Sequence, residues 1–313
     1  MTLLACLALF TLTSCDRFRG PQTAFDGQAA YAMVKTQVAF GPRVPGTEGW
    51  RKTGDWIVAQ LKQLGDSVTE QRWEHVTPTG DTIPMRNIIA HIAPSNAQRV
   101  LYVTHWDTRP TADNDPVLGN RKLPIPGAND GASGVALLLQ VAAALKKTPP
   151  AVGVDLLFVD GEDYGDFTNW SDSAKNPNVL IGSTYYAAHM DTTNKPLYGV
   201  LWDMIGDKDL DIYQEQNSSQ AAPEVVSRVW QTAKQLGYSK YFINAQGEAL
   251  IDDHVPFLDR GVHVIDVIDY NYGPKDAMHP DGWHHTLEDT PDKVSAKSLQ
   301  IVGDVAVKLV TSQ

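Results

Sequence analysis

Apolar residues recur every three or four positions in two stretches near the start of the chain, Phe25–Val38 and Gly46–Leu64. This spacing places apolar side chains on one face of a helix, so both stretches are predicted to be helical. The segment between them, Phe40–Gly46, holds two glycines and two prolines and is typical of a turn. Two stretches with an extended pattern follow, at Ser67–His75 and Met85–Ile92.

From residue 100 onward, short apolar runs alternate with helical periodicity. The runs predicted as buried strands are Val100–His105, Val154–Val159, Tyr198–Met204 and Val262–Ile268. The predicted helices are Gly131–Leu145, Leu180–Met190, Pro223–Gly237 and Ser295–Val310. Such alternation is typical of a parallel sheet that is covered on both faces. We therefore expect an α/β fold with a mixed, mainly parallel central sheet and helices on both faces.

Composition narrows the class of protein further. The chain has 313 residues, of which 42% are hydrophobic and 20% charged, as in ordinary globular proteins. Its net charge of −11 argues against a nucleic-acid binder, which needs a basic face to meet phosphates. The length is near the upper limit for one hydrophobic core, and we expect residues 25–313 to form a single α/β catalytic domain.

The first fifteen residues form an apolar run that is too short to span a bilayer and ends at Cys15. Leu12–Cys15 resembles the lipobox of bacterial lipoproteins, although no Lys or Arg precedes the apolar run. This predicts a signal segment at 1–14, a lipid-anchored tether at 15–24, and an exported protein in the periplasm or at the cell surface. Its only membrane contact would be the lipid at Cys15. The alternatives are a plain secretory signal and a frayed apolar N-terminus.

Polar residues follow the predicted strands at the edge where ligands bind in open α/β sheets. They occur in His105–Asp107, in Asp160–Asp163, at Asp203, in the Gly127–Asp130 loop, and in Gly282–Thr286 near the C-terminus. Each could be a helix cap or a turn residue if it occurred alone. Together they form a set of carboxylates and imidazoles without thiolate, which suits a catalytic Zn²⁺ with one open position.

The neighbouring acids Glu162 and Asp163 could serve two different functions in such a site. Side chains of adjacent residues point in different directions, so one carboxylate can bind a metal while the other stays free to carry a proton. The pattern is therefore typical of a catalytic site.

Several motifs in this half of the chain carry a family resemblance. In chain order, His105-x-Asp107, the segment GANDGASG at 127–134, Gly161–Asp163, Asp203 and His285 resemble the metal-site motifs of the M28 zinc aminopeptidase superfamily. Within it, the chain is more similar to the glutaminyl cyclases (glutaminyl-peptide cyclotransferases), especially bacterial forms. The segments behind this are HWDTRP at 105–110, LWDMIG at 201–206, DDHVPFL at 252–258, and Trp283 shortly before His285.

The resemblance implies a role for individual residues. Asp130, Asp163 and His285 would hold one zinc per chain, with His284 as a competing candidate for the histidine ligand. Glu162 would act as general base and acid. Asp203 and Asp252 would form an acidic pair beside the reacting amide, and Asp266 stands where the animal enzymes have a histidine.

Other residues are placed around that centre. By the resemblance, Trp283 lines the substrate pocket. Trp202 and Trp170 fall within or near motif segments, and their clustering favours an apolar pocket. His105 and Asp107 are candidates for a second metal or for support of the first.

Three function classes remain open at this point. The first is a zinc-dependent cyclotransferase that converts N-terminal Gln of peptides or proteins to pyroglutamate with release of ammonia. The second is an aminopeptidase with two zincs, and the third is a non-catalytic peptide-binding lipoprotein. Zinc content separates them, because we expect one zinc for the cyclase, two for the peptidase and none for the binder.

Overall fold

The structure is a computed structural model and describes residues 22–64, 67–165, 178–191, 193–277, 279–280 and 282–312. The predicted signal segment, the predicted anchor at Cys15 and the predicted pocket residue Trp170 lie outside these residues. Within the described residues, none of the helices has the length and apolar character needed to cross a membrane.

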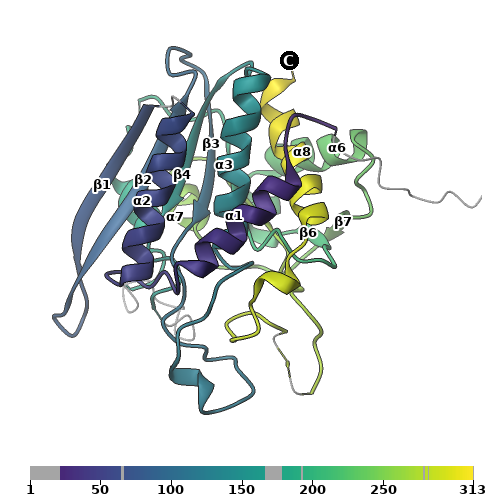
Figure 1. Cartoon of the computed structure of the whole chain (residues 1–313). Helices are drawn as coiled ribbons and strands as arrows, with labels where there is room; N and C mark the ends of the chain where they lie inside the picture. Colours follow the sequence, from purple (N-terminus) through teal and green to yellow (C-terminus); the bar gives the residue numbers. More distant parts are fainter. Residues whose placement is uncertain are drawn as a thin grey trace, which may run out of the picture.

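A six-stranded sheet with the order β1-β2-β4-β3-β5-β8 lies at the centre of the fold (Figure 1). Strands β4, β3, β5 and β8 are parallel, whereas β2 runs antiparallel to both of its neighbours. The mixed, mainly parallel sheet is thereby confirmed. The strands are β1 (Ser67–Val76), β2 (Thr82–Ile92), β3 (Arg99–His105), β4 (Gly153–Val159), β5 (Gly199–Asp203) and β8 (Val264–Ile268).

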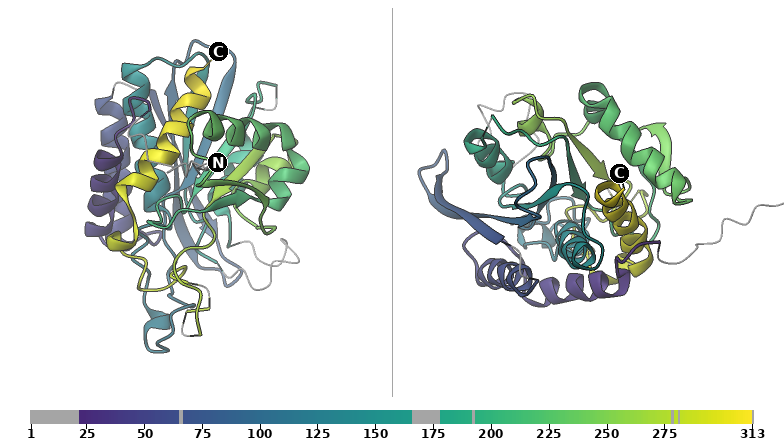
Figure 2. Two further views of the ribbon diagram at one scale, coloured as in Figure 1. Left: turned by 90° about the vertical axis from the view of Figure 1, so that its right-hand side faces the viewer. Right: turned by 90° about the horizontal axis from the view of Figure 1, so that it is seen from above.

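Helices cover both faces of the sheet (Figure 2). In β3, Val100 and Tyr102 join the larger apolar core with α1, α2, α3 and α8, whereas Leu101 and Val103 join a smaller core with α4 and α7. Because neighbouring strand residues face opposite sides, a continuous apolar run serves both cores. These helices are α1 (Gly27–Ala39), α2 (Glu48–Gln63), α3 (Ala132–Lys147), α8 (Ala296–Thr311), α4 (Ile181–His189) and α7 (Val255–Leu258).

The predicted helices and strands in the described residues agree with the structure to within a few residues at their ends. The elements that the sequence pattern missed are short, and too few residues repeat in them to show a period. They are β6 (Ile212–Gln214), α5 (Gln216–Ala221), β7 (Phe242–Gln246), α7, and the single 3₁₀ turns Asn120–Lys122 and Pro291–Lys293. Strands β6 and β7 form a small parallel sheet beside α6 (Pro223–Gln235).

Two long loops meet beyond the carboxyl ends of the parallel strands. The loop at 108–129 and the described residues of the segment at 270–290 project together from that end of the molecule (Figure 1). They are joined directly, because the backbone N–H of Asn114 donates to the carbonyl of His285 at 3.2 Å. The fold thus gathers loops that are far apart in the sequence at the edge where α/β sheets bind their ligands.

Candidate metal site

The order of the strands decides which side chains meet. His105 is the last residue of β3 and Asp203 the last residue of β5, which lies next to it. The Nε2 atom of His105 lies 3.1 Å from Oδ1 of Asp203 and 3.1 Å from Oδ1 of Asp130. Burial alone would lower the pKa of His105, but the charge of Asp203 and hydrogen bonds with Asp107, Asp130 and Asp203 raise it well above its usual value.

Asp130 reaches this place from the start of α3. The helix begins directly after Gly131, whose φ of +82° favours glycine, and a Cβ there would lie 2.8 Å from the carbonyl oxygen of Asp107. The tight turn brings the carboxylate of Asp130 to the end of β3.

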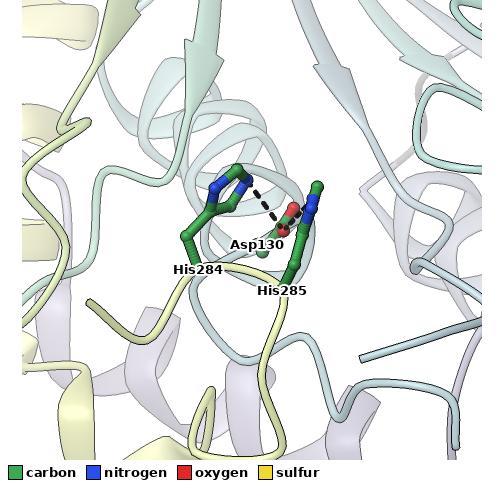
Figure 3. Close-up of side chains that lie close together, drawn as sticks. All are labelled: Asp130, His284 and His285. Carbon is green, nitrogen blue, oxygen red and sulfur yellow. Dashed lines mark ion pairs between the residues drawn. The ribbon is translucent and has the colours of Figure 1, made fainter. Parts of the chain in front are cut away.

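His285 and its neighbour enter the site from the C-terminal loop (Figure 3). Nε2 of His285 lies 2.9 Å from Oδ1 of Asp163 and 3.6 Å from Oδ2 of Asp130, whereas Nε2 of His284 lies 3.9 Å from Oδ2 of Asp130. The structure therefore brings Asp130, Asp163 and His285 together, and His284 lies beside the same carboxylate of Asp130. That these residues bind zinc stays a prediction.

The donor set fits a metal ion. Two overlapping groups, Asp130 with both histidines and Asp130 with His105 and Asp163, each offer ligand atoms within 4.8 Å of one another. Oδ2 of Asp130 and Oδ2 of Asp163 are buried and have no hydrogen-bond partner in the described part of the chain. Buried acceptors of this kind call for a cation or a proton, and carboxylate with imidazole is a donor set that zinc accepts.

The two carboxyl groups of this cluster differ in their electrostatics. Burial, with the charge of Asp163, raises the pKa of Asp130 to about 7. Burial would also raise the pKa of Asp163, but the charge and hydrogen bond of His285 lower it below its usual value. Both groups are therefore tuned by their neighbours, as in sites built to hold a positive charge.

Asp107 supports the cluster through the backbone. Its two carboxylate oxygens accept the N–H groups of Glu162 and Asp163, each at 3.2 Å. It therefore fixes the turn after β4, which favours the supporting role among the two that the sequence left open. Burial and the charge of Asp163 raise the pKa of Glu162 well above its usual value, and its side chain lines the cavity beside the cluster.

The predicted acids Asp203 and Asp252 line the same cavity, whose volume is about 370 Å³. Asp203 accepts the N–H of Met204 at 2.8 Å. Burial, together with the charge of Asp203, raises the pKa of Asp252 to about 7. Asp266 on β8 is also buried, and burial and the charge of Asp252 raise its pKa well above the usual value. The buried acidic group thus extends from the end of β5 to β8.

Of the predicted pocket tryptophans, Trp202 is contradicted by the structure, whereas Trp283 stays a prediction. Trp202 is fully buried in the larger core, edge-on to Tyr102 at 5.5 Å, because it points to the sheet face opposite Asp203. Trp283 packs edge-on to Tyr272 at 5.5 Å and is not among the residues that line the cavity. Among the described lining residues, Tyr270 is the only phenylalanine, tyrosine or tryptophan.

Sequence reasoning missed the residues that hold the Gly127–Asp130 turn. Arg43 is fully buried and donates to the carbonyls of Gly127 at 2.6 Å and Asp130 at 3.1 Å, and also to those of Trp106 and Pro126. The carboxylate of Asp289 accepts the N–H of Asn129 at 2.8 Å and that of Asp130 at 3.2 Å. A lone arginine in a predicted turn gives no signal of such a role.

Arg109 is a further lining residue, and it lies within the HWDTRP segment that carried the resemblance. Its guanidinium makes two bonds to the carboxylate of Asp113, at 2.8 and 2.6 Å, and Nη1 lies 3.8 Å from Oδ1 of Asp163. It also donates to the carbonyls of Asp163 and Gly165, so it joins the loop at 108–129 to the turn after β4.

Carboxylates and imidazoles gathered beyond the carboxyl edge of a mainly parallel sheet are typical of a metal-binding α/β protein. The chain belongs to peptidase family M28, and the family model matches residues 87–310. The resemblance stated from the motifs is thereby confirmed.

The relatives carry two kinds of name. The chain is 25% identical over 312 residues to aminopeptidase YwaD of Bacillus subtilis, covering 96% of this chain and 60% of YwaD. A glutaminyl cyclase structure from Porphyromonas gingivalis has a TM-score of 0.84 and 38% identity, covering 92% of this chain and 98% of that one. A Zn-dependent exopeptidase structure from Parabacteroides distasonis has a TM-score of 0.85 and 36% identity, covering 92% and 99%.

Proposed function

We propose that the protein is a zinc-dependent glutaminyl-peptide cyclotransferase, which converts the N-terminal Gln of peptides or proteins to pyroglutamate and releases ammonia. The observation that carries this proposal is the likeness to the P. gingivalis glutaminyl cyclase over nearly the whole chain, at 38% identity. The segments at 105–110, 201–206 and 252–258, which suggested the cyclases from sequence, each contribute at least one residue to the lining of the cavity described above.

The reaction is an internal acyl transfer. The α-amine nitrogen of the substrate attacks the γ-carbonyl carbon of the same residue, a C–N bond forms, and the bond to the side-chain nitrogen breaks as ammonia leaves. Since the nucleophile is already tethered to its target, the protein gains most by holding a near-attack conformer. A cavity of about 370 Å³, lined in part by the ends of β5 and β8, can hold one such residue.

Three residues would hold the metal: Asp130, Asp163 and His285. When bound, zinc would supply Lewis-acid polarisation of the carbonyl. Glu162 takes the proton from the attacking amine and returns it to the departing nitrogen, and its raised pKa suits a group that must both accept and donate. Asp203 and Asp252 line the same cavity and would accept hydrogen bonds from the NH2 group of the substrate's side-chain amide.

A two-zinc aminopeptidase is the second candidate. Nε2 of His105 lies 3.1 Å from Oδ1 of Asp130 and 3.1 Å from Oδ1 of Asp203. Side chains that could hold a second ion are therefore present. The likeness to the P. distasonis exopeptidase and to YwaD supports this alternative. A second metal would bind the substrate amine, which a cyclase needs as its free nucleophile.

One preparation with measured zinc content decides between them. A Gln-peptide is assayed for ammonia and pyroglutamate, and a Leu-anilide is assayed for hydrolysis. We expect one zinc per chain, ammonia from the Gln-peptide and negligible cleavage of the Leu-anilide. Two zincs with rapid Leu-anilide cleavage and no pyroglutamate would assign the peptidase. A folded protein with no zinc and no turnover would assign the peptide-binding lipoprotein.

A further inference from the structure

A second cavity, of about 320 Å³, adjoins the site. The two cavities share Leu250, Ile268 and Tyr270 in their linings, so these three residues form the wall between them. The remaining residues of the second cavity are Tyr213, Glu215, Gln246, Gly247, Glu248 and Asn271. Neither the metal cluster nor the proposed proton carrier reaches it, so the chemistry described above leaves this cavity without a role.

The segment at 246–252 runs along both cavities and is held firmly from one side. The N–H of Leu250 donates to the carboxylate of Glu215 at 3.0 Å, and Nδ2 of Asn217 donates to the carbonyl of Leu250 at 2.7 Å. The carbonyl of Glu248 accepts the N–H of Gln216 at 2.9 Å. The segment therefore forms a fixed wall that leads from Asp252 in the site to Glu248 in the second cavity.

The charged residues among the described lining of the second cavity are all acidic. Glu248 contributes an exposed carboxylate, whereas the carboxylate of Glu215 is buried behind the lining and accepts backbone N–H groups. None of the described lining residues is Lys, Arg or His. Burial alone would raise the pKa of Glu215, but its contact with His254 and the backbone N–H groups that it accepts lower it to about 2, so it is ionised at neutral pH.

Two tyrosine rings, those of Tyr213 and Tyr270, complete this chemistry, because an aromatic face attracts a cation. The chain itself gives an example. Nζ of Lys275 lies 5.0 Å from the centre of the Tyr270 ring and 3.3 Å from Oδ1 of Asn271. The rim thus already holds an ammonium group against two residues of the lining.

We propose that the second cavity is a subsite for a cationic side chain, Lys or Arg, located one or two residues after the N-terminal Gln of a peptide substrate. This inference rests on the proposed cyclotransferase function. An extended peptide advances roughly 3.3–3.6 Å per residue, so the second and third residues are the ones that can cross the wall from the neighbouring cavity. The subsite would make the protein prefer substrates with a basic residue near the N-terminus.

The test uses two series of peptides, Gln-Xaa-Ala-amide and Gln-Ala-Xaa-amide, in which Xaa is Lys, Ala or Glu. We expect kcat/KM for Lys to exceed that for Glu by about two- to fivefold at one of the two positions, as for an exposed ion pair. Raising the salt concentration should shrink this ratio, since the charges of Glu248 and the ligand are partly exposed to solvent.

Glu248→Lys should invert the preference, and Glu248→Gln should reduce it. Glu74→Lys is the matched control, because it makes the same charge change at an exposed glutamate on β1, at the opposite edge of the sheet. Glutamine amide, which has no second residue, should be cyclised equally by all four proteins.

The outcomes separate the two proposals. If glutamine amide is cyclised but the Lys/Glu ratio is near one in the wild type, or is unchanged in both Glu248 variants, the subsite is wrong and the cyclotransferase stands. If the folded wild-type protein releases ammonia from none of these substrates, the cyclotransferase is wrong and the subsite falls with it. Should Glu248→Lys fail to fold, the ratio in Glu248→Gln decides alone.

Discussion

The residues of the candidate site are placed in two different ways. His105 and Asp203 end the strands β3 and β5, and the pairing of those strands alone brings them together. Asp130 and His285 stand on loops, and no strand holds them. The sheet therefore positions His105 and Asp203, whereas hydrogen bonds outside the sheet position Asp130 and His285.

Those other bonds come from buried polar side chains that are distant in the sequence. Arg43 and Asp289 hold the turn that carries Asp130. Nδ2 of Asn114 donates to the carbonyl of His284 at 3.3 Å, and the carboxylate of Asp115 accepts the N–H of Leu287 at 3.1 Å. Strand ends therefore position one half of the site, and long-range hydrogen bonds position the other half.

The largest expected effect concerns a residue of the turn after β4. Glu162→Gln removes the proton carrier and leaves the predicted ligands in place, so turnover of a Gln-peptide should fall by about 10²–10⁴-fold. Zinc content and the unfolding midpoint should stay at wild-type values. Near-normal turnover with normal zinc would remove Glu162 from the mechanism.

The loop-borne ligands are tested by a pair of neighbouring histidines. His285→Ala should weaken zinc binding by more than about 100-fold, since losing a ligand costs more than losing a residue that supports one. His284→Ala should retain most of the zinc, because His284 lies farther from the carboxylates. Zinc titration of the two variants is the measurement, and the reverse order would make His284 the ligand.

Arg43 should matter to stability more than to chemistry. Arg43→Lys keeps the charge, but one ammonium cannot reach the four carbonyls that the guanidinium contacts. Leaving buried carbonyls unpaired should lower the free energy of unfolding by about 2–4 kcal/mol, measured by denaturant titration. Arg51→Lys is the control, because Arg51 is exposed and donates to a single exposed carbonyl. Equal stability of the two variants would contradict the anchoring role.

The elements that the sequence predicts are the strands and helices, whereas the bonds that hold the loops could not be predicted. The strands β3, β4, β5 and β8 and the helix α3 were predicted because apolar runs and periodicity are local signals. The carboxylates at the strand ends followed from the parallel topology, and the chemistry of Asp130 and His285 came from the family motifs.

The sequence could not predict the support of the loops, because a hydrogen bond between Arg43 and Gly127 has no local signal. It also placed Trp202 in the pocket, since a motif segment does not say which sheet face a residue occupies. Alternation along β5 assigns Trp202 to the core and Asp203 to the site edge.

Glu215 offers a pH test of a loop support. Its pKa is lowered to about 2 in the folded protein, so between that value and the ordinary value near 4.5 the unfolded chain binds a proton that the folded chain does not. The stability that Glu215 contributes is thus present above about pH 4.5 and lost as the pH falls toward 2. The stability difference between wild type and Glu215→Gln should shrink by up to about 1.4 kcal/mol per pH unit below pH 4.5. Urea titrations at pH 6, 4.5 and 3.5 measure it, and a constant difference would refute the assignment.

Asn114 gives the smallest and most specific effect, because it supports the histidine loop without touching the predicted ligand atoms. Asn114→Ala removes the side-chain bond to His284 but keeps the backbone bond to His285. His285 has a φ of +55°, a conformation that costs a non-glycine residue energy and persists only where its neighbours enforce it. Loss of one bond of about 0.5–1.5 kcal/mol should weaken zinc binding by about two- to tenfold, with little change in the free energy of unfolding.

Asn96→Ala, which removes a similar bond to the carbonyl of Ala151 away from the site, should leave zinc binding unchanged. If both variants bind zinc like the wild type, the strand ends and the Asp130 turn suffice to hold the metal, and the contrast between the two halves of the site is weaker than the hydrogen bonds indicate.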